Sequence, residues 1–134
     1  MIPNAEAILG AYLREHPAVE ALKARVVPET PSSDVLPWVK VTQHDALAVG
    51  GSRTDYLIEW FGTFDCYAGT GGDQATASLL TRTVREALLL APEASFEGAT
   101  VTGVRFTSCP RLPDTYFEPA MQRYALSAIV WMHP

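Results

Sequence analysis

The chain has 134 residues and a formal net charge of −5, with lysine at positions 23 and 40 alone. This acidic charge argues against nonspecific nucleic-acid binding, which needs basic residues along one face to displace counterions, and we expect no specific nucleic-acid binding either. The length suits one domain, so we expect residues 1–134 to form a single domain. The apolar runs fall short of the roughly 20 residues that span a membrane, and the N-terminus does not resemble a signal peptide. We therefore expect no membrane partner and synthesis in the cytoplasm.

Two helical segments and a short strand are predicted first. Asn4 can cap a helix that stops at His16, because Pro17 disfavours helical geometry in the residue before it. Residues 18–24 then form a second short turn of helix, and residues 25–27 a brief strand. The apolar face of the first helix follows a three- and four-residue spacing and consists of Ala5, Ile8, Leu9, Tyr12 and Leu13.

A long hairpin is the next predicted feature. After a proline-rich loop at residues 28–37, Trp38–Gln43 is expected to pair with Tyr56–Ala68 across a loop at residues 44–55. A strand as long as Tyr56–Ala68 either bends or projects beyond its own core, and a projecting strand can hold a neighbouring subunit. One face of this strand should carry Ile58, Trp60, Phe64 and Cys66, and the other Leu57, Glu59, Phe61, Asp65 and Tyr67.

The remaining elements are a helix and two strands. Asp73 can cap a helix over residues 75–90, and strands are predicted at 99–108 and 122–132 around a proline-rich loop. We expect an α+β fold with a mixed, mainly antiparallel sheet of four to five strands, helices packed on it and one long projecting hairpin. Thr81 should lie on the solvent-exposed face of the helix. Its buried stripe should consist of Leu79, Leu80, Val84, Ala87, Leu88 and Ala91.

The glycine-rich turn at residues 69–72 is the first candidate for chemistry. A strand, a glycine loop and a helix can cradle a phosphate. Here the third position of the dinucleotide motif is Gln74, no Lys-Ser/Thr pair follows, and Asp73 places a negative charge where a phosphate would sit. A plain turn is the better interpretation, and we expect no cofactor.

Histidine and cysteine also give weak signals. No two of the three histidines lie within four residues of each other, so local metal-ligand spacing is absent and we expect no metal. His16 is interpreted as a favourable charge at a helix C-terminus. His44-Asp45 lies in a predicted loop and could form half of a site, although an exposed turn is favoured. Cys66 and Cys109 are interpreted as buried free thiols, and we predict no catalytic residue.

An assembly role agrees better with the sequence. Arg105 and Arg123 lie in otherwise apolar strands, where each arginine must reach water or a carboxylate, within the chain or across an interface. Tyr116 and Phe117 lie in a proline-stiffened loop that could dock a partner or fold back on its own core. The candidate residues for a subunit or partner interface are Arg53, Glu59, Asp65, Arg105, Tyr116, Phe117 and Arg123.

The order of these elements resembles the tail terminator (tail-completion, minor tail) proteins of long-tailed bacteriophages. The likeness covers nearly the whole chain and lies in organisation more than in fixed residues. The parts that carry it are His16-Pro17, Val19–Val27, Trp38–Gln43, Phe64-Asp65-Cys66-Tyr67-Ala68 before the helix, Val101–Phe106, the Pro113-Asp114 loop and Gln122-Arg123-Tyr124-Ala125-Leu126. The glycine-rich segment at residues 44–55 is not matched.

This resemblance implies a structural virion protein that assembles as a ring, a homohexamer in the family. Such a ring caps the tail tube, ends tail polymerisation and provides the head-joining surface. The implied partners are further copies of the chain, a tail tube protein and a head–tail connector protein. The implied location is the head-proximal end of the tail, after assembly in the host cytoplasm. The alternatives are a connector stopper or adaptor and, from another class, a small cytosolic ligand-binding or enzymatic dimer.

Overall fold

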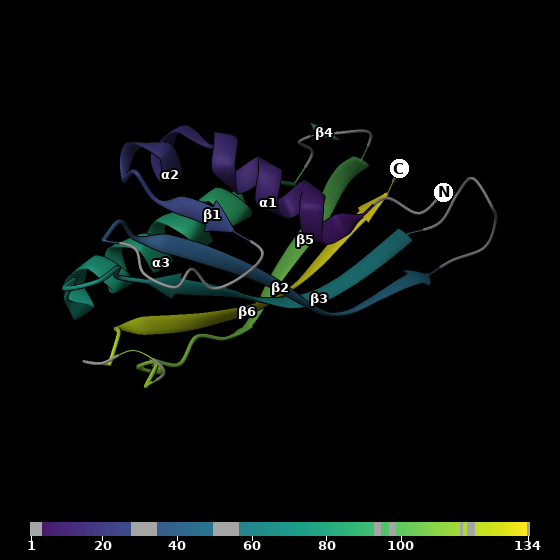
Figure 1. The fold of residues 1–134 in the computed structure, drawn as a ribbon. Helices are drawn as coiled ribbons and strands as arrows, with labels where there is room; N and C mark the ends of the chain where they lie inside the picture. Colours follow the sequence, from purple (N-terminus) through teal and green to yellow (C-terminus); the bar gives the residue numbers. More distant parts are fainter. Residues whose placement is uncertain are drawn as a thin grey trace.

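Helices cover one face of a single sheet in the computed structural model of the chain (Figure 1). The structure describes residues 4–27, 35–49, 57–92, 95–96, 99–115, 117 and 120–133. The helices are α1 (Ala5–Glu15), α2 (Pro17–Ala21) and α3 (Gln74–Leu89). The strands are β1 (Arg25–Val27), β2 (Trp38–Val49), β3 (Leu57–Tyr67), β4 (Ser95–Phe96), β5 (Ala99–Ser108) and β6 (Arg123–His133).

The sheet has the strand order β1-β2-β3-β6-β5-β4. Among the described strands, only β1 and β2 are parallel, and every other pair of neighbours is antiparallel. The predicted α+β fold with a mixed, mainly antiparallel sheet is thus confirmed. The two-residue β4 lies at one edge and adds a sixth strand to the four or five that were expected.

Helix α1 begins and ends where the sequence predicts. The Ala7 N–H donates to Asn4 Oδ1 over 3.2 Å, which satisfies one of the free amides at the helix start. The helix ends before Pro17, which begins α2. The role of His16 differs from the predicted one, because its Nδ1 accepts the Ala18 N–H at 3.3 Å. His16 therefore caps the start of α2, where the Ala18 N–H has no acceptor within the helix.

Gly10 is a position where the sequence is not optimal for stability. It lies in the middle of α1, and a Cβ atom built there meets no other atom within 4 Å. Alanine loses less backbone entropy than glycine on folding, so we expect Gly10→Ala to stabilise the chain by about 0.5–1 kcal/mol. Urea unfolding of both variants measures this difference. A loss of stability would mean that this side of α1 is in contact with something else.

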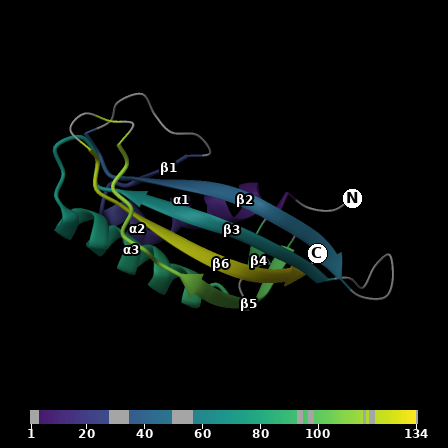
Figure 2. The same ribbon diagram turned by 90° about the horizontal axis from the view of Figure 1, so that it is seen from below.

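In the hairpin of β2 and β3, the first strand, β2, is longer than expected. The predicted loop from His44 is wrong at its start, because β2 continues to Val49, which pairs with Leu57. The register shifts between Gln43 and Asp45, so His44 is the extra residue of a β-bulge. A bulge absorbs one residue and bends the strand without ending it. The loop end of the hairpin extends past helices α1 and α3 (Figures 1 and 2).

The main core lies between the helices and the inner face of the sheet. The predicted inner residues of β3 are buried there: Ile58, Trp60, Phe64 and Cys66. The predicted stripe of α3 is wrong at two positions, 79 and 81. Leu79 is 44% exposed, whereas Thr81 is 6% exposed and donates from Oγ1 to the Ala77 carbonyl over 2.7 Å. This bond satisfies the hydroxyl, so threonine can occupy the buried stripe.

A second, smaller cluster lies on the opposite face of the sheet. Trp38 and Tyr67 stack with ring centroids 4.6 Å apart, and Met121 and Phe117 pack against them. Met121 and Phe117 come from the segment between β5 and β6, which therefore folds over this end of the sheet. Burial of the Trp38 and Tyr67 rings fixes where that segment crosses.

Candidate functional site

The sheet face away from the helices carries most of the candidate interface residues. Figure 2 shows this face, with α1 behind the strands. Alternation along the strands and the register place Glu59 and Asp65 of β3, Arg123 of β6 and Arg105 of β5 on it. We call this surface the open face. Its members include Glu59, Phe61, Thr63, Asp65, Arg105, Arg123, Ser127, Ile129 and Trp131.

Arg123 is the centre of a polar network at one end of the open face. Its Nη1 lies 3.7 Å from Asp65 Oδ1 and donates to Tyr67 Oη over 3.4 Å. Its Nε donates to the Leu112 carbonyl over 2.9 Å, and Tyr67 Oη donates to Asp114 Oδ2 over 2.9 Å. The guanidinium thus ties the segment after β5 to the sheet, and it finds its carboxylate within the chain.

Burial dominates the electrostatics of this network. The Asp65 side chain is 12% exposed. Burial raises the pKa of this carboxyl group, although Arg123 and Lys40 act in the opposite direction. Burial and the hydrogen bond to Asp114 raise the pKa of Tyr67 to about 12. Tyr67 is therefore a neutral donor at pH 7, and ionising Asp65 costs more free energy in the folded chain than in the unfolded chain.

Asp65→Asn should change how stability depends on pH. A carboxyl group whose pKa is raised on folding adds stability below its unfolded pKa, and this contribution is lost as pH rises through the folded pKa. The substitution removes that loss, so we expect it to raise the free energy of unfolding more at pH 7 than at pH 3. The difference between the two pH values should be no more than about 1 kcal/mol. Thermal unfolding at both pH values tests this. A larger benefit at pH 3 would contradict the assigned shift.

The other candidate residues on this side differ in their contacts. Glu59 Oε2 accepts the Trp131 indole N–H at 3.0 Å. Arg105 is exposed on the open face. Phe117 lies 5.8 Å from the Trp38 ring, so this side chain folds back on its own core. Arg53 and Tyr116 lie outside the described residues, and the intersubunit role of the whole set stays a prediction.

His44 makes contacts that the sequence did not reveal. As the extra residue of the bulge, it places its Nε2 atom 2.6 Å from Thr63 Oγ1, which lies 3.2 Å from Ser127 Oγ. The imidazole ring also packs beside Phe61, with centroids 5.4 Å apart. Thr63 is only 8% exposed and is held from both sides. The three side chains therefore connect β2, β3 and β6. In the sequence, Gly62 within the long strand is the signal of a bulge, because glycine inside a strand often marks one.

The two cysteines differ in exposure. Cys66 is buried, and burial raises the pKa of its thiol to about 12, so it is an inert core group. The prediction of a buried Cys109 is wrong, because β5 ends at Ser108 and Cys109 is exposed. Both thiols are free. The described residues contain no group of three side chains suited to a metal, and none of the helices has the length and apolar character of a membrane span.

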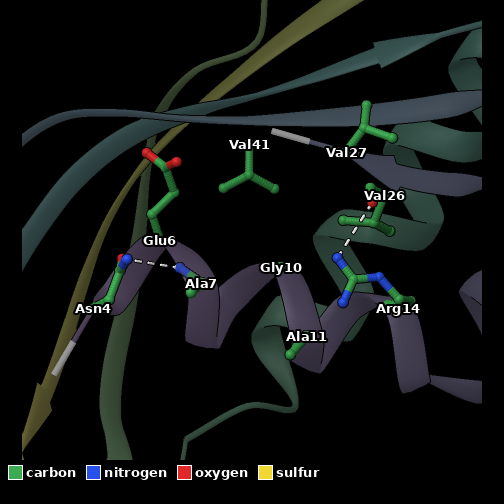
Figure 3. Close-up of a pocket in the computed structure, with 9 residues that line it drawn as sticks. All are labelled: Asn4, Glu6, Ala7, Gly10, Ala11, Arg14, Val26, Val27 and Val41. Carbon is green, nitrogen blue, oxygen red and sulfur yellow. Dashed lines mark hydrogen bonds between the residues drawn. The ribbon is translucent and has the colours of Figure 1, made fainter. Parts of the chain in front are cut away.

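A hollow lies away from the open face, between α1 and the edge of the sheet (Figure 3). Its volume is about 410 Å³. We call it the α1–β2 groove, and its lining residues are Asn4, Glu6, Ala7, Gly10, Ala11, Arg14, Val26, Val27 and Val41. Its two charged side chains bond to backbone groups, Glu6 to the Gln43 N–H and Arg14 to the Val26 carbonyl. The lining is therefore mainly small and apolar.

Comparisons with known proteins find a likeness of structure. No family model and no curated protein matches the chain. A chain in the solved structure entitled "Virion of native gene transfer agent (GTA) particle" has the same fold. It superposes with a TM-score of 0.67 at 17% identity, over 96% of this chain and 94% of that one.

The likeness extends over the whole set of elements. Because 96% of this chain is covered, the superposition includes both α1 at one end and β6 at the other. The two chains also have nearly the same length, since 94% of the other chain is covered. At 17% identity this agreement establishes the fold that the two chains share.

Proposed function

We propose that this chain is a structural virion protein of a long-tailed phage or phage-like particle, and within that class a tail terminator. The observation that carries the proposal is the shared fold with a chain of a gene transfer agent virion over nearly the full length of both. The order of elements that resembles tail terminators supports the finer assignment. In this proposal the chain has no catalytic role.

The proposed protein acts by assembly. Copies associate head to tail, and a rotation that closes gives a ring, for which the resemblance suggests six members. One side of the ring sits on the last ring of tail tube protein and blocks further addition. The other side offers a surface to the head–tail connector. The net charge of −5 agrees with partners that are proteins, because a nucleic-acid surface would favour a basic chain.

Solution mass and tube binding test this function. We expect light scattering over a wide concentration range, with negative-stain images of the same fractions, to show closed rings or a monomer that forms rings on purified tail tubes. Tubes capped with the chain should no longer elongate when tube protein is added. A chain that binds connectors but not tubes would support a stopper or adaptor. A stable dimer with a tightly bound metal or nucleotide would contradict a structural role.

A further inference from the structure

Among the described strands, none pairs with the outer edge of β2 along most of its length. Strand β1 pairs with Trp38–Lys40 only. From Val41 to Val49, no described strand lies on the side of β2 that faces away from β3. A free edge of this length presents a row of backbone donors and acceptors to any added strand.

Two carboxylates occupy the outward amides of this edge. The Gln43 N–H donates to Glu6 Oε2 over 2.9 Å, and the Ala46 N–H donates to Asp45 Oδ1 over 2.8 Å. Gln43, Asp45 and Ala46 are exposed, so these bonds compete with water and can be exchanged. The same two N–H groups are the donors that a further strand would use. These two amides are thus bonded in the single chain and can be released to a partner.

The α1–β2 groove provides space beside this edge. It lies between α1 and the edge, and Val26, Val27 and Val41 form the sheet side of its lining (Figure 3). Ala7, Gly10 and Ala11 on the helix side are small. A strand added to β2 would place its inward side chains in this hollow, so apolar burial would add to the backbone hydrogen bonds.

The opposite edge of the same sheet has the complementary properties. Strand β4 pairs only with Ala99 and Thr100, so among the described strands none covers the outer side of β5 beyond them. The register of β5 with β6 shifts between Val101 and Gly103 and again between Phe106 and Ser108. Between these two shifts, around Arg105, β5 pairs regularly with β6. Arg85 stacks over Phe106 with 5.2 Å between the guanidinium carbon and the ring centroid. This edge is therefore basic, whereas Glu6 and Asp45 make the β2 edge acidic.

The directions of the two edges also agree. Three antiparallel steps separate β2 from β5, so the two strands run in opposite directions. A rotation that relates two copies about an axis parallel to the strands leaves the strand directions unchanged. It would therefore set β5 of one copy antiparallel to β2 of the next. Asp45 and Arg105 both face the open side of the sheet, so such pairing brings acid and base together.

We propose that a second copy of this chain docks by strand addition, with its β5 edge around Arg105 on the free β2 edge around Asp45. Glu6 and Asp45 release the Gln43 and Ala46 amides as the strand arrives. This contact is heterologous, so repeated use leads to a ring or a filament. In the proposed function this is the contact between neighbouring subunits of the ring. The closure of the ring rests on the proposed function, whereas the pairing of the two edges does not.

Charge reversal tests the proposed contact. We would measure self-association by sedimentation velocity for the wild type, Asp45→Lys, Arg105→Glu and the double variant. Each single reversal should weaken association about tenfold or more, and the double variant should recover most of it. Both side chains are exposed, so circular dichroism and the melting temperature should stay close to those of the wild type.

A proline substitution separates the backbone from the charges. Ala46→Pro removes an outward N–H that the chain's own sheet does not use, and Ala46→Ser is the matched control that keeps it. We expect Ala46→Pro to weaken association and Ala46→Ser to leave it unchanged. If the wild type is monomeric in solution, the same variants are compared for ring formation on purified tail tubes. Single reversals that associate as the wild type does, in solution or on tubes, would overturn the edge contact. Loss of tube capping with the edge contact intact would instead overturn the proposed function.

Discussion

Replacing Gly62 by alanine is expected to lower the free energy of unfolding by about 3 kcal/mol. Gly62 lies in β3 opposite Gln43, at the edge of the bulge in β2. A Cβ atom there would lie 2.3 Å from the indole ring of Trp60 and 2.4 Å from the Thr42 carbonyl oxygen. Trp60 is fully buried and packs against Phe64, so its ring has little room to move. The Thr42 oxygen belongs to the backbone of the neighbouring strand and is harder still to displace.

Gly103→Ala is the matched control for Gly62→Ala. Gly103 also lies within a strand, but a Cβ atom there has its nearest contact at 3.4 Å, with Trp131. We expect a change of less than about 1 kcal/mol at this position. Urea unfolding of both variants gives the comparison. If Gly62→Ala and Gly103→Ala were equally stable, the hairpin would have adjusted around the added methyl group at position 62. The packing of Trp60 over Gly62 would then not restrict this position.

The sequence predicts most element bounds because the local signals are strong. Asn4 and Asp73 cap their helices as expected, with Asp73 Oδ1 accepting the Thr76 N–H at 2.9 Å. Strand β5 has the predicted bounds, and β3 and β6 differ from theirs by one residue at each end. Proline and glycine mark the breaks between these elements, and their backbone restrictions act without tertiary contacts.

Tertiary contacts decide the features that the sequence did not reveal. The glycines at positions 50 and 51 favour a loop, but the pairing of β2 with β3 extends the hairpin to Val49 through the bulge at His44. Thr81 is buried in α3 because the Ala77 carbonyl accepts its hydroxyl. Each outcome depends on a partner group whose position is fixed only in the folded chain.

The candidate site was predictable in part. Alternation along the strand places Glu59 and Asp65 on one face, and the register then adds Arg105 and Arg123. The sequence could not show that Asp65 and Arg123 are already paired within the chain. That pairing leaves Arg105 as the exposed arginine on the open face among these candidates, and it agrees with the use of Arg105 in the proposed edge contact.

Arg123→Met is expected to destabilise the chain by about 2–3 kcal/mol. Methionine keeps an unbranched apolar stem, so the change mainly removes the guanidinium. Asp65 then stays nearly buried without the guanidinium beside it, and the Leu112 carbonyl loses the N–H that Arg123 donates. Arg111→Met is the matched control, because Arg111 is exposed and its Nη2 donates to Gln122 Oε1 over 3.2 Å. It should cost less than about 0.5 kcal/mol.

A double-mutant cycle with Asp65→Asn identifies the origin of this loss. If the unpaired carboxylate is the main cost, Arg123→Met should be less harmful in the Asp65→Asn background. Amide hydrogen exchange supplies the local measurement, because exchange should quicken at Leu112 and Asp114 while the β3–β6 pairing stays protected. Additive effects of the two substitutions would contradict the role of Asp65. Unchanged exchange at Leu112 would show that Arg123 does not hold the segment. Because Phe117 belongs to that segment, a released segment would also free its ring from Trp38, which connects this network to the predicted docking residues.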